Sequence, residues 1–572
     1  MRRPPRRPPP RGSKDAPPTL GPDYTPRVVL TPQAALGLRR GFNQLASVLG
    51  LTLGPRGRTV VLESGGGLRP PEVLDKGGLI ARRLVELPDR QADVGAMYLR
   101  GLLTRLDETH GDGTATAALL FQHVYNAGLR WVSAGGNAML LRRALEHGLE
   151  LILAELQQAA QPFSGGPAGL RQIAQSVCQD VAVAEALGEI FDTLGPWGQI
   201  ELRENQRRGV RSEFLAGSYW DGGLHNPEIL AGSAGVRLAL EEPAFLVSNL
   251  ALEDPAALGV ALNNAYQAGH RAIVLVAAQL SPACVGLLSQ TRQRGASLKV
   301  LAVKPPGGLP DVVADLMDDL AALTGAQPLV RAAGATLADF TPAMLGRARW
   351  AWADRGHFGL LRGGGDPAAL AARAAALERA YRAAESVGAC EALRLRLGNL
   401  HGGAYALWLD GPNEAAIRRR RHAAEVAIHT LRGVLEGGQL PGGGWALLAC
   451  RPALTAWNRR AASEEERAAA RLLLGALEAP FRALVANAGD DAGQALAAVA
   501  GADAALAAQA GRYLGYDVLT GRAVDLRAAG IIDSARLVQA VVRAALSGAA
   551  LALTIDVIVH HKRPALALEP EA

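Results

Sequence analysis

The segment Gly111-Asp112-Gly113-Thr114-Ala115-Thr116 has the composition of a phosphate-binding loop that opens a helix. Glycines let the backbone approach an anion closely, and threonine hydroxyls donate hydrogen bonds to phosphate oxygens. The helix that follows adds unpaired N–H groups and the positive end of its dipole. Asp112 would repel a bare phosphate, so its presence indicates a bridging divalent cation, for which Mg²⁺ is the natural candidate.

Two further glycine-rich turns lie beside expected helices. Thr52-Leu53-Gly54-Pro55-Arg56-Gly57 follows one helix, and Pro441-Gly442-Gly443-Gly444-Trp445 opens another. Taken singly, each of the three turns is a weak signal, because glycine-rich turns beside helices are commonly structural. The sequence contains no GxxxxGK[ST] motif, which disfavours a P-loop ATPase.

Amphipathic helices are expected to position these turns. Thr31-Pro32 is typical of a helix start with a proline in the first turn. The β-branched run 59–62 predicts a short strand after the turn at 52–57, and the pattern from about 85 to 160 is helical. Two apolar faces recur at helical spacing: Leu38, Phe42, Leu45 and Leu49 before the first turn, and Ala117, Leu120, Phe121 and Val124 after the phosphate loop.

The middle of the chain has a different pattern. Between about 212 and 327, short β runs alternate with helical stretches, as in 273–276 and 300–303 with the helical segment 282–294 between them. This alternation predicts an inserted α/β domain. Long helices resume near 367, and a short β run at 555–559 closes the pattern. The two helical blocks are expected to pack together as one discontinuous domain.

Composition favours a soluble, multi-domain, cytoplasmic protein. With 572 residues, several domains are expected. We expect neither a membrane span nor a secretory signal, because no apolar run of about 18 residues occurs and no apolar segment follows the basic N-terminus. The four cysteines are scattered, which favours a reducing compartment. Residues 1–26, rich in Arg and Pro, predict a disordered arm, with contact to an acidic partner as the alternative.

The three turns, in their order along the chain, resemble the nucleotide site of the GroEL-type group I chaperonins, the 60 kDa chaperonins, and the chain resembles a divergent member of that family. The resemblance extends from Arg27 to about Lys562. The matching segments include these: 35–62, 111–116 with Ala115 in place of a threonine, 195–200, 303–325, Gly402-Gly403, Glu425 with His429 and Arg432, 442–444, 478–480, 487–489 and Ile532-Asp533.

This resemblance implies a multi-domain chaperonin fold with a mostly α-helical, discontinuous equatorial domain, a small α/β intermediate domain and an α/β apical domain. The implied bounds are 27–158 with 437–562 for the equatorial domain, 159–213 with 402–436 for the intermediate hinge domain, and 214–401 for the apical domain. Residues 1–26 and 563–572 are expected to be a disordered arm and tail.

The resemblance also implies the residues of two sites. Asp112 would hold Mg²⁺, and the other residues of the phosphate loop would bind the phosphates of ATP. Unfolded polypeptide would bind Tyr219, Leu224 and Val285 in the apical domain. The implied ATP-binding set is Thr52, Leu53, Gly54, Pro55, Gly113, Thr114, Ala115, Thr116, Gly443 and Asp533, with Asp533 at the ribose.

The chain departs from the family where two aspartates should position the attacking water. Lys76 and Val426 occupy these places, and a positioned base contributes about 10²–10⁴-fold to a rate. We therefore expect weak hydrolysis, with Asp75 as a candidate replacement because the preceding loop is longer. Glu425 points about 100° away from Val426 on the expected helix.

Two functions stay open. One is a chaperonin subunit that assists folding in a homo-oligomeric or mixed ring, with a co-chaperonin as a candidate partner. The other is a hydrolysis-deficient structural or regulatory subunit. Gly223, Ser289 and Gln290 at expected client positions predict a reduced client range, since capture needs contiguous apolar surface. The basic run 418–421 favours a solvated helix face or a subunit contact over nucleic acid.

Overall fold

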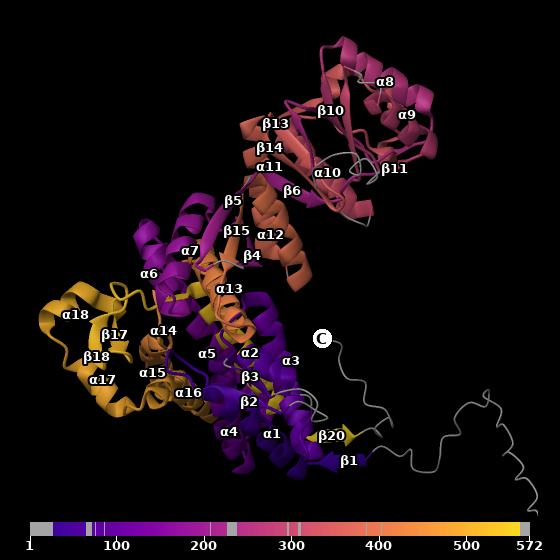
Figure 1. Cartoon of the computed structure of the whole chain (residues 1–572). Helices are drawn as coiled ribbons and strands as arrows, with labels where there is room; N and C mark the ends of the chain where they lie inside the picture. The colour runs from indigo at the N-terminus through magenta and orange to yellow at the C-terminus, as the bar shows by residue number, and fades with distance from the viewer. Residues whose placement is uncertain are drawn as a thin grey trace, which may run out of the picture.

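The computed structural model describes residues 27–63, 71–74, 76–84, 86–205, 208–225, 237–293, 297–306, 310–384, 386–401 and 403–560. The folded chain has three parts that lie one after another in space (Figure 1). We call them the helical body, the hinge region and the α/β body. The predicted arm 1–26 and tail 563–572, with Asp75 and Gly402, lie outside the described residues.

The helical body is built from both ends of the sequence, as the two helical blocks predicted. Its helices are α1 (Gln33–Gly50), α2 (Gly77–Arg83), α3 (Arg90–His110), α4 (Thr114–Ser133), α5 (Ala138–Ala159), α14 (Trp445–Ala449), α15 (Arg451–Arg460), α16 (Glu464–Ala488) and α19 (Ala535–Ala552). The predicted apolar faces are confirmed, because Leu38 to Leu49 and Ala117 to Val124 supply residues of one core with α19.

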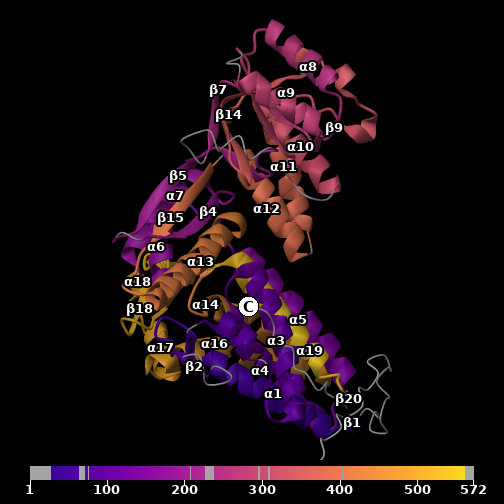
Figure 2. The ribbon, with the colours of Figure 1, turned by 45° about the vertical axis from the view of Figure 1, so that its right-hand side comes forward.

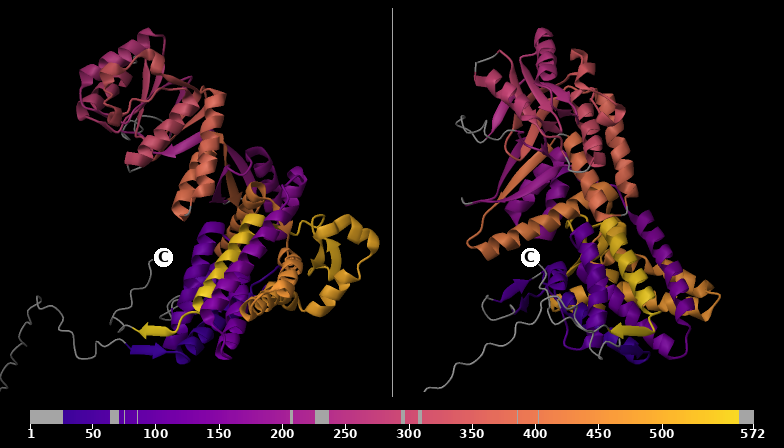
Figure 3. Two further views of the ribbon diagram at one scale, coloured as in Figure 1. Left: turned by 180° about the vertical axis from the view of Figure 1, so that it is seen from behind. Right: turned by 90° about the vertical axis from the view of Figure 1, so that its right-hand side faces the viewer.

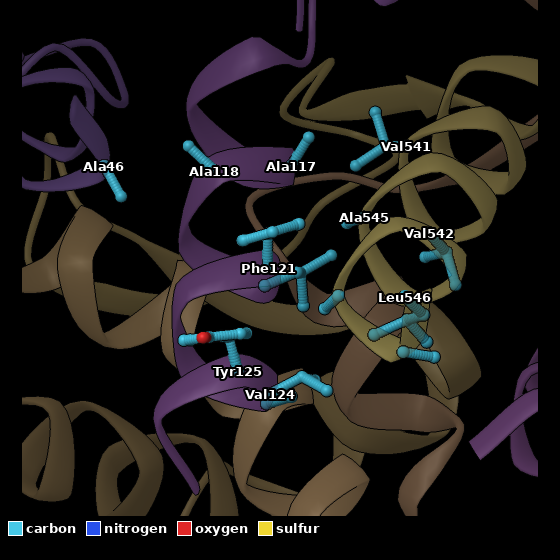
Figure 4. Close-up of a cluster of buried hydrophobic side chains, with 14 of the residues drawn as sticks. Ala46, Ala117, Ala118, Phe121, Val124, Tyr125, Val541, Val542, Ala545 and Leu546 are labelled. Carbon is cyan, nitrogen blue, oxygen red and sulfur yellow. The ribbon is translucent and has the colours of Figure 1, made fainter. Parts of the chain in front are cut away.

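Helix α4 packs directly against α19, although some 420 residues separate the two in the chain. Figure 4 shows Phe121 and Val124 of α4 beside Val542 and Leu546 of α19 in the shared core. Among the described residues, α19 is the one helix long and apolar enough to cross a membrane, and 56% of it is buried. Its packing against α4 and α5 is that of a core helix in the helical body.

Short strands and a small lobe complete this part. β1 (Arg27–Leu30) pairs antiparallel with β20 (Val557–His560), so the two ends of the described chain lie side by side (Figure 3). The predicted strand at 59–62 is confirmed as β2 (Val60–Leu62), which pairs with β3 (Glu72–Leu74). The lobe contains α17 (Ala492–Ala500), α18 (Ala504–Ala510), β17 (Leu514–Asp517) and β18 (Arg522–Asp525).

The hinge region joins the two outer parts through one sheet (Figure 2). Strand β15 (Gly403–Leu409) lies between β4 (Gln199–Glu204), to which it is parallel, and β5 (Arg211–Ala216), to which it is antiparallel. The chain therefore enters the α/β body after β5 and returns from it through β15, the adjacent strand. The helices of this region are α6 (Gly166–Cys178), α7 (Val181–Leu194) and α13 (Glu414–Gly437).

The α/β body has a seven-stranded sheet in the order β12-β10-β8-β13-β14-β6, with β7 paired to β13. The two predicted strands are confirmed within β10 (Ala272–Val276) and β12 (Lys299–Val303), which are parallel. The other strands are β6 (Ser218–Asp221), β7 (Leu238–Glu241), β8 (Ala244–Val247), β13 (Gly346–Ala353) and β14 (His357–Gly363). The helices are α8 (Pro255–Gln267), α9 (Pro282–Gln293), α10 (Pro310–Thr324), α11 (Pro367–Ala383) and α12 (Val387–His401), and the predicted domain bounds stay a prediction.

One polar contact links all three parts. Arg536 of α19 donates from Nη1 to the Tyr381 hydroxyl of α11 at 2.7 Å and to Glu436 Oε2 of α13 at 2.5 Å. Burial raises the pKa of Glu436, and the Arg536 guanidinium acts in the opposite direction. Trp197 packs edge-on against the Tyr381 ring at 5.1 Å. The positive charge of Arg536 therefore compensates a buried carboxylate at the junction of the three parts.

We expect Arg536→Ala to destabilise the protein by about 3 kcal/mol, because it leaves the buried Glu436 without its cation. The measurement is the shift in the midpoint of urea unfolding at pH 7. Arg382→Ala is the matched control, since Arg382 is 74% exposed and pairs with Glu378 at 3.6 Å. Its cost should stay below about 1 kcal/mol. Equal shifts in the two variants would contradict the role given to Arg536.

Candidate nucleotide-binding site

A cavity of about 1140 Å³ lies between the helical body and the hinge region. The three glycine-rich turns form much of its wall, so segments far apart in the sequence meet there. Asp112 and every residue of the predicted ATP-binding set line this cavity: Thr52, Leu53, Gly54, Pro55, Asp112, Gly113, Thr114, Ala115, Thr116, Gly443 and Asp533. Asp75, the tentative catalytic residue, lies outside the described residues.

The phosphate-loop segment is a sharp connection between α3 and α4. Gly111 and Gly113 have φ of 71° and 83°, a region that side chains disfavour, which explains the need for glycine at both places. Asp112 Oδ1 accepts a hydrogen bond from the Gly113 N–H at 2.6 Å. In the described structure no side chain caps the start of α4. The N–H groups of its first turn are therefore available to an anion in the cavity.

The turn at 52–57 is held against the end of α16. The Asn487 side-chain amide donates to the carbonyls of Gly50 and Leu53 at 2.8 and 2.9 Å. The Arg56 guanidinium donates to the carbonyls of Ala488 and Leu519 at 3.2 Å each. These bonds fix the backbone of Leu53 and its neighbours as one wall of the cavity.

The third turn and Asp533 are brought together by strand pairing. β16 (Gln439–Pro441) pairs antiparallel with β19 (Ile532–Ser534), and Leu440 is opposite Asp533. Gly443 and Gly444 follow β16 with φ of 65° and 82°, and α14 begins at the next residue. Asp533 therefore lies beside the third glycine turn because of a two-stranded ladder, which no local motif specifies.

Two carboxyl groups share this cavity. Burial within the protein, together with the smaller effect of the neighbouring Asp112, raises the pKa of Asp533 to about 7. Burial also raises the pKa of Asp112, against the opposing effects of the Gly113 N–H and Lys76. Acidic groups that resist ionisation gain from a cation that would neutralise them. Among the described residues, no three His, Cys, Asp or Glu side chains lie close enough together to hold a metal ion, so Mg²⁺ on Asp112 would need phosphate and water oxygens as its other ligands.

The two positions that depart from the chaperonin pattern also face the cavity. Val426 of α13 and Lys76 both line it. Lys76 Nζ lies 3.2 Å from Asp107 Oδ1, and Arg82 Nη2 lies 3.1 Å from the other oxygen of this buried carboxylate. The cation at position 76 thus has an internal counter-charge in α3. Val426 presents an apolar side chain on the hinge side of the cavity.

No sequence motif indicated the other residues that line the cavity. The hinge region contributes Gln175, Ser176 and Gln179 from α6 and its end, with His422 from α13. The lobe contributes Asp517 to Leu519, at the end of β17 and in the turn after it. These residues carry no local signature, because packing of the hinge region and the lobe against the helical body brings them to the cavity.

The predicted polypeptide-binding residues lie in the α/β body, and their joint role stays a prediction. Tyr219 is half-buried in β6, and Val285 is half-buried in α9. Leu224 is only 1% exposed and forms a β-bridge with Val303. In this structure the Leu224 side chain belongs to the core of the α/β body, and its role in client binding stays a prediction.

Comparison with known proteins gives a family match over part of the chain and a shared fold over most of it. Residues 287–563 match the TCP-1/cpn60 chaperonin family. The chain is similar to two crystal forms of the chaperonin gp146 from bacteriophage EL 2 (Pseudomonas aeruginosa), each at 18% identity. Each match covers 94% of this chain and 99% of the phage chain, with TM-scores of 0.72 and 0.61. The predicted chaperonin fold and its divergent sequence are confirmed.

Asp533→Asn should stabilise the ligand-free protein at pH 8 and leave its stability unchanged at pH 4. The pKa of Asp533 rises from 3.8 to about 7 on folding, so the folded state binds this proton more tightly. Stability contributed by the protonated group is present below about pH 4 and is lost as pH rises to about 7, at about 1.4 kcal/mol per pKa unit. Thermal unfolding in EDTA measures the difference between variant and parent.

Asp192→Asn, an exposed change on α7, is the control for this titration. Its difference from the parent should not vary between pH 4 and pH 8. A pH-independent effect of Asp533→Asn would show that the carboxyl group titrates normally in the folded state.

Proposed function

We propose that this chain is a member of the TCP-1/cpn60 chaperonin family, whose model matches residues 287–563, and that it binds ATP as a subunit of a ring that assists the folding of other polypeptides. The observation that carries the proposal is the convergence of all three glycine turns on one cavity with the free start of α4. The phage chaperonin structures were determined in the presence of ATP-BeFx, which supports the same ligand here.

The shape of the cavity suggests how the nucleotide lies. The phosphates would accept hydrogen bonds from the first-turn N–H groups of α4 and from the hydroxyls of Thr114 and Thr116. Mg²⁺, when bound, would neutralise the phosphate charge beside Asp112. At the other end, Asp533 would hydrogen-bond a ribose hydroxyl, and the backbone at Leu53 and Gly443 would enclose the sugar and base.

Hydrolysis in this site would be slow. Val426 can neither accept a proton nor orient a water molecule, and its apolar surface faces the cavity. Lys76 places a cation where the family has a second carboxylate, and Asp107 pairs with that cation. These two positions support long-lived binding of ATP over rapid turnover.

The same two positions support a second candidate function, a structural or regulatory subunit. Such a subunit would use ATP as a ligand that stabilises assembly, in its own ring or in a mixed ring with a conventional chaperonin. The client surface also supports it, because Leu224 is buried and polar Ser289 and Gln290 lie on α9. The four cysteines are free thiols, which supports a cytoplasmic location and leaves a co-chaperonin as a candidate partner.

Mg-ATP should raise the midpoint of thermal unfolding of the parent protein. A ligand that binds only the native state stabilises it by about 2.7 kcal/mol at a hundredfold excess over Kd. Asp112→Ala should lose most of this shift, because it removes the only proposed protein ligand of Mg²⁺. Asp192→Ala should keep the full shift. A parent protein without any shift would refute the proposed ATP site.

Val426→Asp should raise steady-state phosphate release, by about 10²-fold or more if the carboxylate orients water. Val426→Asn is the matched control, because asparagine has the shape of aspartate and cannot act as a base. Lys76 cannot be replaced alone by Asp, since its partner Asp107 would then face a second carboxylate. The full restoration is therefore Lys76→Asp with Asp107→Asn and Val426→Asp.

One result of the phosphate-release measurements would contradict the role given to the missing carboxylate. Equal rates for Val426→Asp and Val426→Asn, in proteins that bind Mg-ATP normally, would show that the missing carboxylate does not limit turnover. Rapid phosphate release by the parent would lead to the same conclusion.

A further inference from the structure

His422 lies on α13 one helical turn before the place of the missing carboxylate. It precedes Val426 by four residues, so the two side chains point within about 40° of each other, one helical turn apart. Both side chains line the large cavity. Glu425, by contrast, lies about 100° around the helix from Val426. A basic side chain is therefore present on the same face of α13 that has lost its acid.

His422 also forms part of the boundary between two cavities. A second cavity of about 600 Å³ adjoins the first, and His422 and Lys76 line both. The His422 side chain is 20% exposed, so its ring is confined yet reaches solvent-filled space. When protonated, His422 would oppose the upward effect of burial on the pKa of Asp112. This coupling places the ring within electrostatic reach of the phosphate loop.

Glu425 orients the imidazole. Nδ1 of His422 lies 3.5 Å from Glu425 Oε2, at the long end of hydrogen bonding. The contact with His422 lowers the pKa of Glu425, so this carboxylate is ionised. Glu425 is itself held by Arg421, whose Nε lies 3.4 Å from the other carboxylate oxygen. A carboxylate at Nδ1 favours the tautomer with its proton there, which leaves the Nε2 lone pair free to accept another proton.

We propose that His422, positioned by Glu425, accepts the proton of the water that attacks the γ-phosphate during slow ATP hydrolysis by this chain. The proposal rests on the ATP site proposed above. The water oxygen forms a bond to the γ-phosphorus, and its proton passes to Nε2 of His422. The bond from the γ-phosphorus to the bridging oxygen breaks, and its electron pair stays with ADP. The imidazolium then returns its proton to solvent.

This assignment explains how a site with Val426 and Lys76 can retain turnover. His422 acts from one turn away, so its base is farther from the phosphate loop than a carboxylate at position 426 would be. Turnover through His422 should therefore be slow, and a carboxylate at position 426 should make His422 dispensable.

The test measures steady-state phosphate release and Mg-ATP thermal shifts in the full-length protein. His422→Ala and His422→Asn should lower the parent kcat by about 10²-fold and leave the Mg-ATP shift unchanged. Free imidazole should restore part of the turnover of His422→Ala, which a purely structural defect would not allow. Glu425→Gln should lower kcat without changing KM. His401→Ala, an exposed change outside both cavities, is the control.

A third comparison uses the Val426→Asp background, in which His422→Ala should cost little. Full turnover in His422→Asn, failure of imidazole to rescue His422→Ala, or parent turnover at background level would each overturn the role of His422. So would loss of the Mg-ATP shift in His422→Ala, since the residue would then act on binding. Absence of that shift in the parent refutes the ATP site itself, which separates the two failures.

Discussion

The packing of α4 against α19 is the contact on which the rest of the structure depends. The phosphate loop begins α4, and Asp533 lies two residues before α19 begins. When Phe121 and Val124 bury their side chains against Val542 and Leu546, the starts of both helices come to the same end of the helical body. Apolar burial therefore brings the two acids of the cavity together.

Those acids would be costly in a cavity with no ligand. Burial raises the pKa of both acids, Asp112 further raises that of Asp533, and both are enclosed by protein. Repulsion between two buried carboxylates favours the binding of a cation or a proton, because either reduces the negative charge. The two acids therefore destabilise the ligand-free protein, and a bound cation would restore the lost stability.

The hinge helix α13 decides what chemistry such a ligand meets. It lies across the cavity and carries His422, Glu425 and Val426 on neighbouring positions. Its far end is held by Glu436, through the buried contact with Arg536 and Tyr381. Any movement of the α/β body relative to the helical body must strain or break that contact. The position of α13, and so of its cavity side chains, is coupled to the arrangement of all three parts.

Much of the local structure follows from the sequence alone. The spacing of Leu38, Phe42, Leu45 and Leu49 specifies α1, because an amphipathic helix must bury that face. Gly111 and Gly113 specify a turn with positive φ before α4, and the runs at 273–276 and 300–303 specify buried parallel strands. The order of the glycine turns was enough to indicate a resemblance to the chaperonins and to name residues that line one cavity.

Only the tertiary structure decided which side chains are available and what surrounds them. The sequence pattern at Leu224 is the same whether that side chain faces a client or the core, and the bridge to Val303 buries it. The pairing of Lys76 with Asp107, the coupling of Asp533 to Asp112, and the place of His422 beside the cavity all join distant segments. A local pattern specifies helices, strands and turns through interactions within a few residues. The burial of a side chain and the charges around it depend on segments far away in the sequence. They are therefore determined only when the whole chain folds.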